Sequence, residues 1–454
     1  MIKFLPLGGA GEIGANCYYL NIAGTGVILD CGMHPRKTGL DCLPSFNLIE
    51  DKPVDYALIS HAHQDHLMSL PFLVKKHPYI KIITSLQTRE LAELTLHNSV
   101  SIMMKELDEN HKFQFYTHEE IDLLSQTIDF RRVGETFEIE GYNHRSNNQI
   151  KISFHDAGHI LGSVSMLIEH NNKKIFYTGD INTTNQTLLK GCILPKTKVD
   201  TLILECTYGT TDSSSILSWS KEAERFAAEA NKVFNNGGSI LIPVFALGKM
   251  QEILSTIWKL MARNKLPRID IYSGGIGIKI NRLYDANRYL VNMVDTDFQL
   301  KSIPIKNLNY VENPEEFFNS PSIVVASSGM IIEGTTSFNL AKSWLKKKNS
   351  AIFIVGYMDE NTPGYRISKS KMGDNIKLTD FSEEQTVKCL IKHFKFSAHS
   401  NREGLIEIVH RLKPQQVILI HGDDDAISWV GNEVLKKFHN IKVHKAELGK
   451  EIEI

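Results

Sequence analysis

The chain has 454 residues, more than one hydrophobic core usually serves, so its length predicts two or three domains. Its composition, 42% hydrophobic and 23% charged, is that of a globular protein and excludes a disordered or fibrous one. With 51 Lys and Arg against 52 Asp and Glu, it lacks an overall positive charge, so a nucleic-acid partner would have to be attracted by a local groove.

The cysteines and the first residues favour a cytoplasmic location. Six cysteines are scattered without a Cys-x-x-Cys pair, which fits a reducing compartment better than a disulfide framework. Residues 1–9 predict a short strand rather than a signal peptide. No apolar run approaches the roughly 18 residues of a transmembrane helix. We therefore expect a cytoplasmic protein without a membrane partner.

Residues 9–14, Gly-Ala-Gly-Glu-Ile-Gly, match the GxGxxG pattern of dinucleotide-binding proteins. That pattern requires a helix after the glycines, because the helix N-terminus holds the pyrophosphate. Two strands follow instead, over residues 16–22 and 27–30. We therefore interpret the glycines as a tight β-turn. Asp30 ends the second strand, where it either orients ligand histidines or is an ordinary turn residue.

The densest group of metal-ligand side chains follows the apolar segment 54–59, which predicts a buried strand. His61, His63, Asp65 and His66 lie within six residues, on the loop that leaves the carboxyl end of this strand. Neutral imidazole and carboxylate suit zinc, and a hydrolytic site needs about three such ligands with an open position for water. The sequence therefore predicts a hydrolytic metal site here.

Further candidates recur at predicted strand ends. Helices are expected over residues 89–105 and 119–127, and strands over 149–155, 163–169, 174–179 and 199–204. His159 lies in a glycine-bracketed loop between two of these strands. Asp180 and Glu205 each end an apolar strand. A single acid of this kind is usually a turn residue, but the repetition beside a histidine cluster favours a shared site.

After Gly209 the chain alternates strands and long helices, which is typical of a parallel sheet in a second domain. Helices are predicted over residues 217–235, 249–264, 276–290 and 337–348, and strands over 239–245, 269–273, 322–326 and 351–357. Two further candidates follow: His399 in Phe-Ser-Ala-His, and His421 after the strand 416–420.

The ordered set Asp30, His61/His63/Asp65/His66, His159 and Asp180 closely resembles the metallo-β-lactamase superfamily. Glu205 in Leu-Glu-Cys-Thr-Tyr-Gly, His399 and His421 match motifs A, B and C of its β-CASP branch of nucleic-acid-processing nucleases. The stretches 242–254 and 326–330 agree with that branch. The chain is similar to its compact bacterial members and to the nuclease cores of ribonuclease J and the cleavage-and-polyadenylation endonuclease subunit.

The resemblance implies an α/β fold, a metallo-β-lactamase αββα sandwich with an inserted parallel-sheet β-CASP domain. The expected parts are residues 1–208, the insertion 209–372, and the C-terminal return 373–454. It also implies two zinc ions, with manganese as the alternative. One ion would be held by His61, His63 and His159, and the other by Asp65, His66 and His421. Asp180 would bridge both ions.

By the same resemblance, the chain is a ribonuclease that hydrolyses single-stranded RNA with a two-zinc-activated hydroxide. Asp65, Glu205 and His399 are the catalytic residues, with Glu205 and His399 as the general acid pair. Members acting on RNA usually carry histidine at motif C, as at His421, whereas members acting on DNA tend to carry valine. The RNA would pass through a groove between the two domains.

Several alternatives stay open. The chain could be a DNA nuclease, a thioester or lactam hydrolase of the same fold, or a non-catalytic RNA-binding subunit. Internal cleavage, 5′-3′ exonuclease action and a homodimer are all compatible with the sequence. Ser327, Ser328 and Gly329 either bind a substrate phosphate or form a strand-to-helix turn. Lys346–Lys348 either attract RNA or form a solvated helix face, and Lys249, Pro363 and Tyr365 depart from the family pattern.

Overall fold

The computed structural model describes residues 2–110, 114–141, 149–311, 313, 317–318 and 320–454. The chain divides into two compact units. The first contains Met1–Thr184, Gly191–Ser213 and His399–Ile454, and the second contains Asn185–Lys190 and Ser214–Ala398. The expected return at residue 373 falls inside the second unit. The structure places the return at His399 because strand β19 still belongs to the second unit's sheet.

The first unit contains two sheets of seven described strands. The first has the order β22-β1-β2-β3-β4-β5-β6. Its strands are β1 (Ile2–Gly8), β2 (Cys17–Ile22), β3 (Thr25–Leu29), β4 (Tyr56–Leu58), β5 (Lys81–Ser85), β6 (Ile128–Arg131) and β22 (Ile452–Glu453). Strands β3 to β6 are parallel, so the residues that follow β3 and β4 lie at the same edge of this sheet.

The second sheet has the order β21-β20-β11-β10-β9-β8-β7. Its strands are β7 (Thr136–Ile139), β8 (Ile150–Asp156), β9 (Val164–His170), β10 (Lys173–Tyr177), β11 (Thr201–Glu205), β20 (Gln416–Ile420) and β21 (Lys442–Lys445). Strands β10, β11 and β20 are parallel neighbours. Their carboxyl ends therefore bring Asp180, Glu205 and His421 to one edge.

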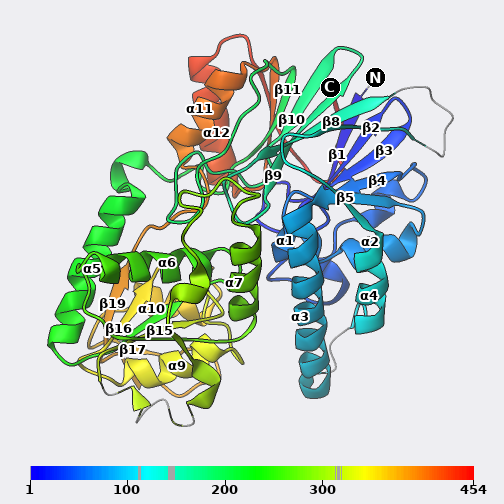
Figure 1. The fold of residues 1–454 in the computed structure, drawn as a ribbon. Coiled ribbons are helices and arrows are strands. Elements are labelled where there is room, and N and C mark those ends of the chain that lie inside the picture. Colours follow the sequence, from blue (N-terminus) through cyan, green and yellow to red (C-terminus); the bar gives the residue numbers. More distant parts are fainter. Residues whose placement is uncertain (1, 111–113, 142–148, 312, 314–316, 319) are drawn as a thin grey trace. The chain divides into compact units, whose positions relative to one another are not determined.

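One hydrophobic core joins the two sheets. Buried side chains of the first sheet, such as Phe4 and Leu29, pack in the same cluster as Phe154 and Ile168 of the second. Helices cover the outer faces (Figure 1). They are α1 (Gln64–Leu67), α2 (Leu70–Lys76), α3 (Leu86–Asn110) and α4 (His118–Thr127) beside the first sheet, and α11 (Arg402–Leu412) and α12 (Asp424–Lys437) on the second. This arrangement confirms the predicted αββα sandwich.

The glycine stretch 9–14 leads into strand β2 without a helix. Gly9, Gly11 and Gly14 have φ of 67°, 76° and 137°, a region that favours glycine. The glycines thus lie in a connection between two strands, as expected, but this connection spans residues 9–16 and is longer than the predicted tight β-turn. A pyrophosphate site of the dinucleotide type lacks the helix on which it depends.

The second unit is built on a parallel sheet with the order β14-β13-β15-β12-β16-β19. Its strands are β12 (Ile240–Pro243), β13 (Asp270–Ser273), β14 (Ile305–Asn307), β15 (Ser322–Ala326), β16 (Ala351–Ile354) and β19 (Leu390–His393). A short pair, β17 (Asn375–Ile376) and β18 (Gln385–Thr386), stands apart from it. The prediction of a parallel-sheet domain in this part of the chain is confirmed.

Helices lie on both faces of this sheet (Figure 1). They are α5 (Trp219–Asn235), α6 (Lys249–Ala262), α7 (Ile276–Asn287), α9 (Thr336–Leu345) and α10 (Pro363–Lys369). On one face, α9 packs in a cluster with Leu241 and Ile352. On the other, Phe226 of α5 contacts Phe353 with ring centroids 5.3 Å apart. Neighbouring residues of β16 thus pack against the helices on opposite faces of the sheet, as strand geometry requires.

Short 3-10 turns complete the described structure: η1 (Gly39–Cys42), η2 (Phe46–Ile49), η3 (Ser213–Ser215), η4 (Leu300–Ser302) and η5 (Leu308–Tyr310). Among the helices that the structure describes, none combines the length and the apolar character needed to cross a membrane.

Candidate metal centre

The histidine cluster begins just beyond strand β4. His61 lies in the loop, and His63 is the N-cap residue of α1, which contains Asp65 and His66. The expected loop thus becomes a helical turn after two ligand candidates. His61 and His66 are buried, whereas His63 and Asp65 are partly exposed. One short segment therefore directs four donor side chains to the edge of the first sheet.

The second sheet supplies the other candidates. His159 lies in the loop between β8 and β9, Asp180 follows β10, and His421 follows β20. All three side chains are at most 3% exposed. The loop geometry is constrained, because a Cβ at Gly158 would lie 2.6 Å from the backbone nitrogen of Cys192. The edges of the two sheets therefore meet around these side chains.

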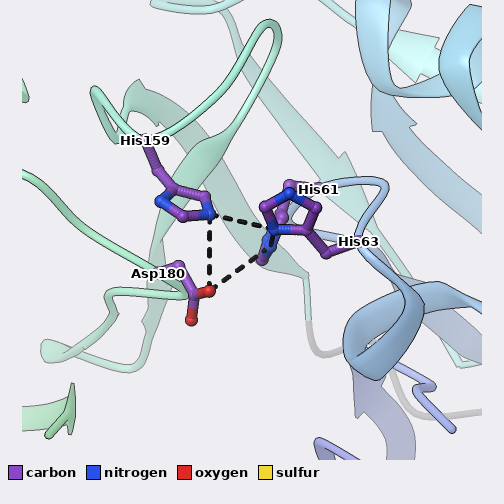
Figure 2. A group of neighbouring side chains, drawn as sticks. All are labelled: His61, His63, His159 and Asp180. Atoms are coloured by element: carbon purple, nitrogen blue, oxygen red, sulfur yellow. Dashed lines mark hydrogen bonds and ion pairs between the residues drawn. The ribbon is translucent and has the colours of Figure 1, made fainter. Parts of the chain in front are cut away.

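The first ligand group contains His61, His63, His159 and Asp180 (Figure 2). Nδ1 of His63 lies 3.2 Å from Nε2 of His61 and 3.0 Å from Nε2 of His159. Oδ2 of Asp180 lies 3.5 Å from each of these two Nε2 atoms. Three ring nitrogens and one carboxylate oxygen thus face a common point.

The second ligand group contains Asp65, His66 and His421. Oδ2 of Asp65 lies 3.7 Å from Nε2 of His66 and 3.6 Å from Nε2 of His421. Oδ1 of Asp180 lies 3.2 Å from both nitrogens. Each carboxylate oxygen of Asp180 therefore faces a different ligand group, which is the arrangement expected of a bridging residue.

These distances suit metal coordination. Ligands on a tetrahedral zinc ion, with bonds of about 2.0 Å to nitrogen and oxygen, lie roughly 3.3 Å apart. The buried Oδ1 atom of Asp180 has no hydrogen-bond partner among the described residues. A buried carboxylate oxygen without a hydrogen bond is costly, and a cation would satisfy it. The donor atoms therefore fit two metal ions with Asp180 between them.

Burial sets the charge of the first ligand group. It lowers the pKa of His61 and, with help from the nearby His61 ring, lowers the pKa of His63 to about 3. Burial and the neighbouring His399 also lower the pKa of His159 well below its ordinary value. These rings are therefore neutral near pH 7, the form that binds metals.

Asp30 fixes the tautomers of one histidine in each ligand group. Its Oδ2 atom accepts hydrogen bonds from Nδ1 of His66 at 2.8 Å and from Oγ of Ser60 at 2.7 Å. Because Ser60 donates to Asp30, its oxygen accepts the proton on Nδ1 of His61, 2.9 Å away. In their neutral forms both histidines then keep a lone pair on Nε2, which faces the ligand groups. The structure thus gives Asp30 the orienting position, not that of a surface turn. Against the effect of burial, the carboxylates of Asp180, Asp65 and Asp30 raise the pKa of His66 well above its ordinary value, so a metal ion at this group would displace a proton.

Glu205 and His399 form a pair beside the first ligand group. Nδ1 of His399 lies 3.1 Å from Oε1 of Glu205, and its Nε2 lies 4.0 Å from Oδ2 of Asp180. Glu205 is fully buried and accepts the backbone N–H groups of Ile181 and Thr207. The carboxylate therefore orients the imidazole so that Nε2 faces the centre.

Two residues that contact this centre were not predicted from the sequence. The phenol of Tyr177 donates to Oδ2 of Asp30 at 2.5 Å. Nδ2 of Asn16 lies 3.0 Å from Nε2 of His66. Neither residue is of a type that metal-ligand spacing reveals. Tyr177 is only recognisable as the last residue of the strand before Asp180, and Asn16 as the first polar residue after the glycine stretch.

The remaining candidates lie in the second unit. Ser327, Ser328 and Gly329 follow β15, but α9 begins only at Thr336. Oγ of Ser328 accepts the N–H of Ile332, and the backbone oxygen of Ser328 accepts the hydroxyl of Ser337. These contacts give the segment a structural role in a turn that precedes the helix by several residues.

The residues that depart from the family pattern, and the lysines near them in the sequence, also have defined contacts in the second unit. Pro363 begins α10, and Thr362 caps this helix by accepting the N–H of Tyr365. The ammonium group of Lys249 donates to the backbone oxygen of Phe396 and lies 5.5 Å from the ring of Trp219. Lys347 donates to the backbone oxygen of Phe318, and its neighbours Lys346 and Lys348 are exposed.

Comparison with family models gives three matches along the chain. Residues 19–205 match a metallo-beta-lactamase superfamily domain. Residues 250–367 match a Beta-Casp domain, and residues 384–445 match a Zn-dependent metallo-hydrolase RNA specificity domain. The three models cover both units and include all the residues of the two ligand groups.

Several curated proteins are similar to this chain over most of its length. Cleavage and polyadenylation specificity factor subunit 3 of Dictyostelium discoideum is 31% identical over 98% of this chain and 56% of its own length. Endoribonuclease ysh1 of Schizosaccharomyces pombe is 28% identical over 98% of this chain and 57% of its own. The chain thus spans little more than half of these relatives.

Two further comparisons involve chains of similar size. An RNase J-like protein of Methanocaldococcus jannaschii is 29% identical over 92% of this chain and 91% of its own length. A crystal structure of a protein of unknown function from Enterococcus faecalis covers 100% of both chains with a TM-score of 0.61 and 13% identity. The latter shows a shared fold alone.

Proposed function

Because this chain belongs to the β-CASP branch of the metallo-β-lactamase superfamily, we propose that it is a metal-dependent ribonuclease that hydrolyses phosphodiester bonds of single-stranded RNA. The observation that carries the proposal is the position of Asp180, with one oxygen toward each ligand group, next to the Glu205–His399 pair. The family match to a Zn-dependent RNA specificity domain and the similarity to an endoribonuclease support the choice of metal and substrate.

The residues divide the chemistry between them. When bound, two metal ions would supply an activated water nucleophile and neutralise negative charge on the phosphodiester. His61, His63 and His159 would hold one ion, Asp65, His66 and His421 the other, and Asp180 both. Neutral imidazoles and carboxylates suit zinc, and the carboxylates also admit manganese.

The protein itself provides the proton for the leaving ribose oxygen. Glu205 accepts the proton on Nδ1 of His399 and so directs Nε2 toward the centre. In its protonated form this imidazole donates from Nε2, and the buried carboxylate stabilises the resulting positive charge before transfer. The pair therefore serves as the general acid, a role that hydrolysis of a thioester does not need, since a thiolate leaves without a proton.

A binding role for Ser327, Ser328 and Gly329 stays a prediction. They follow the carboxyl end of β15, next to β12, where the connections of the sheet change direction. Ligands of open α/β sheets usually bind at such a point. Ser327→Ala would weaken RNA binding if the segment contacts phosphate, and Ser320→Ala, before the same strand, is the control.

The test uses labelled single-stranded RNA, single-stranded DNA and a thioester, each incubated with metal-loaded protein. We expect cleavage of RNA only, and loss of cleavage in His63→Ala and Glu205→Gln. His439→Ala, at an exposed position, is the control for histidine replacement. If the wild type leaves RNA intact, or if both variants cut it as fast as the wild type, the proposal is wrong.

The same assay separates the alternatives. Cleavage of DNA alone would indicate a DNA nuclease, thioester hydrolysis alone a small-molecule hydrolase, and RNA binding without cleavage a non-catalytic subunit. A circular RNA distinguishes cleavage modes, because only an endonuclease can open it. Loading with zinc or manganese identifies the active metal. A homodimer and a cytoplasmic location are further predictions, checked by light scattering and by cell fractionation.

A further inference from the structure

The glycine stretch 9–14 has no role in the chemistry described so far, yet it contacts the second ligand group. The backbone oxygen of Gly9 accepts the N–H of His421 at 2.8 Å. Asn16, which follows the stretch, donates its backbone N–H to the oxygen of Asp65 at 2.9 Å. The turn therefore joins two members of this group through the backbone.

The Asn16 side chain reaches the same group. It is fully buried. Its Nδ2 atom lies 3.0 Å from Nε2 of His66 and 3.4 Å from Oδ2 of Asp65. Asp30 accepts the proton on Nδ1 of His66, so in the neutral ring Nε2 carries a lone pair and the Asn16 amide is the donor.

Tyr18 supports the orientation of the Asn16 amide at the end that faces away from His66 and Asp65. The hydroxyl of Tyr18 lies 2.8 Å from Oδ1 of Asn16 and 3.1 Å from the backbone oxygen of Gly9, and its one proton is shared between these two acceptors. Tyr18 is fully buried, and its ring stacks on Phe4 with centroids 5.6 Å apart, so the hydroxyl has little freedom to move. Because the carboxylate of Asp65 can only accept, the amide presents its donor Nδ2 to Asp65 and His66, which leaves Oδ1 facing the Tyr18 hydroxyl.

We propose that Asn16 is a positioning residue of the second ligand group, held in its orientation by Tyr18. When no metal is bound and His66 is neutral, its amide donates to the Nε2 lone pair of His66. With that lone pair on a metal ion, the amide donates to Oδ2 of Asp65 and holds this carboxylate in place. This inference rests on the proposed two-metal centre and adds a residue to it.

The inference predicts an effect on one ligand group only. The contacts of the Asn16 side chain reach His66 and Asp65, whereas those of Asp30 reach both groups through His61 and His66. Loss of a partner that supports metal ligands typically costs about 10–100-fold in metal affinity. If Asn16 had a purely structural role, its loss would lower the stability of the fold and would not change the dissociation constant of one ligand group more than that of the other.

The experiment titrates metal-free protein with Co²⁺ and records the visible absorption, and equilibrium dialysis with Zn²⁺ measures both dissociation constants. His63→Ala and His421→Ala provide reference spectra in which one ligand group has lost a ligand. The test variants are Asn16→Ala and Tyr18→Phe. Tyr19→Phe is the matched control, because its hydroxyl, on the same strand, donates to the backbone oxygen of Pro53.

In Asn16→Ala we expect the dissociation constant of the second group to rise about 10–100-fold, while that of the first group is unchanged. Tyr18→Phe should show a smaller rise at the same step, and Tyr19→Phe none. Equal constants in Asn16→Ala and wild type, or an equal rise at both steps, would overturn the inference while leaving the two-metal centre intact. A wild type that binds fewer than two ions would overturn both.

A second variant covers the case in which Asn16→Ala unfolds for reasons unrelated to metal. Tyr18→Phe keeps the ring that packs in the core and removes only the hydroxyl, so it tests the same contact in a folded protein. If Tyr18→Phe and Tyr19→Phe bind both ions alike and Asn16→Ala does not fold, the positioning role assigned to the Tyr18–Asn16 contact is wrong.

Discussion

Nδ1 of His399 lies 3.1 Å from Oε1 of Glu205, a carboxylate that also accepts two backbone N–H groups. Three donors converge on one buried carboxylate, which keeps it in place without help from solvent. The imidazole is thus held through Nδ1. Its other nitrogen, Nε2, faces the metal centre and stays available to donate a proton. Glu205 and His399 come from positions 194 residues apart, and only the fold makes them partners.

The first prediction concerns Glu205→Gln. The amide keeps the shape of the side chain but removes the negative charge that favours a protonated His399. Because general acid catalysis contributes roughly 10²–10⁴-fold, we expect kcat for RNA cleavage to fall at least about 100-fold. The content of bound metal should not change, since Glu205 lies outside both ligand groups. Steady-state kinetics and metal analysis by mass spectrometry measure the two effects.

Glu138→Gln, at an exposed position in β7, is the control for this variant. It should cleave RNA like the wild type. A Glu205→Gln variant that retains its full rate would exclude the acid pair, and one that loses metal would assign Glu205 to the ligand set.

The second prediction separates the two ligand groups. His63→Ala and His421→Ala each remove one ligand nitrogen from a different group, so each variant should bind about one metal ion tightly where the wild type binds two. Asp180→Ala should weaken both, because its two oxygens face different groups. Metal content after gel filtration measures this. Loss of both ions from each histidine variant would mean that the groups form a single site.

Sequence alone predicted the strand ends with particular success. A histidine or acid after an apolar strand is visible in the chain, and parallel strands bring such residues to one edge. Asp30, His61, Asp180 and Glu205 were all recognised in this way. The tautomers that Asp30 imposes on two histidines depend on Ser60 and Tyr177, whose side chains carry no metal-ligand signature.

The missed features have physical reasons as well. Asn16 is an ordinary polar residue at the start of a strand, and only three-dimensional contact shows that its amide meets His66. The position where the chain returns to the first unit was also misplaced, because β19 pairs with a strand about 40 residues earlier and its segment lacks a strong apolar pattern. Long-range pairing of a half-exposed edge strand leaves little trace in the local sequence.

The third prediction is that metal removal destabilises the first unit. The donor atoms of both groups converge in a buried region, and Oδ1 of Asp180 has no hydrogen-bond partner among the described residues, so a bound cation would satisfy a buried polar atom. Binding at 100 times the dissociation constant stabilises a fold by about 2.7 kcal/mol for each site. Chelation should therefore lower Tm, and added Zn²⁺ should restore it. An unchanged Tm in scanning calorimetry would contradict a metal centre in the folded state.

The fourth prediction concerns Glu252 in the second unit. This side chain is 1% exposed, and its carboxylate accepts backbone N–H groups of Thr187, Leu188 and Leu189. Burial outweighs these hydrogen bonds and raises its pKa from 4.5 to about 7. At about 1.4 kcal/mol per unit, the raised pKa contributes roughly 3 kcal/mol of stability that is present below pH 4.5 and lost as the pH rises through 7.

Glu252→Gln removes the ionisation but keeps an oxygen that accepts hydrogen bonds. Its free energy of unfolding should therefore fall less than that of the wild type between pH 4.5 and 7.5. Denaturant titrations across this range, below the pKa of about 8 that burial gives Lys249, measure the difference. Glu224→Gln, exposed on α5, should follow the wild-type curve. Parallel curves for Glu252→Gln and wild type would contradict the raised pKa.

The fifth prediction tests the glycine turn by comparing Gly9→Ala with Gly24→Ala. Both glycines have positive φ, 67° and 94°, so alanine costs about 1–2 kcal/mol of backbone strain at each position. At Gly24 nothing lies within 4 Å of the new Cβ, whereas at Gly9 it would lie 2.3 Å from Oδ1 of Asn16 and from the hydroxyl of Tyr18.

These two buried oxygen atoms share a hydrogen bond, so relief of the clash at Gly9 must move them apart. Overpacking of this kind costs about 1–3 kcal/mol, and Gly9→Ala should lose that much stability beyond the loss in Gly24→Ala. It should also weaken metal binding at the group of His421, whose N–H donates to the Gly9 oxygen. Denaturant titration and metal dialysis measure both effects. Equal stability losses and unchanged metal affinity in the two variants would mean that the turn only joins strands and does not support the centre.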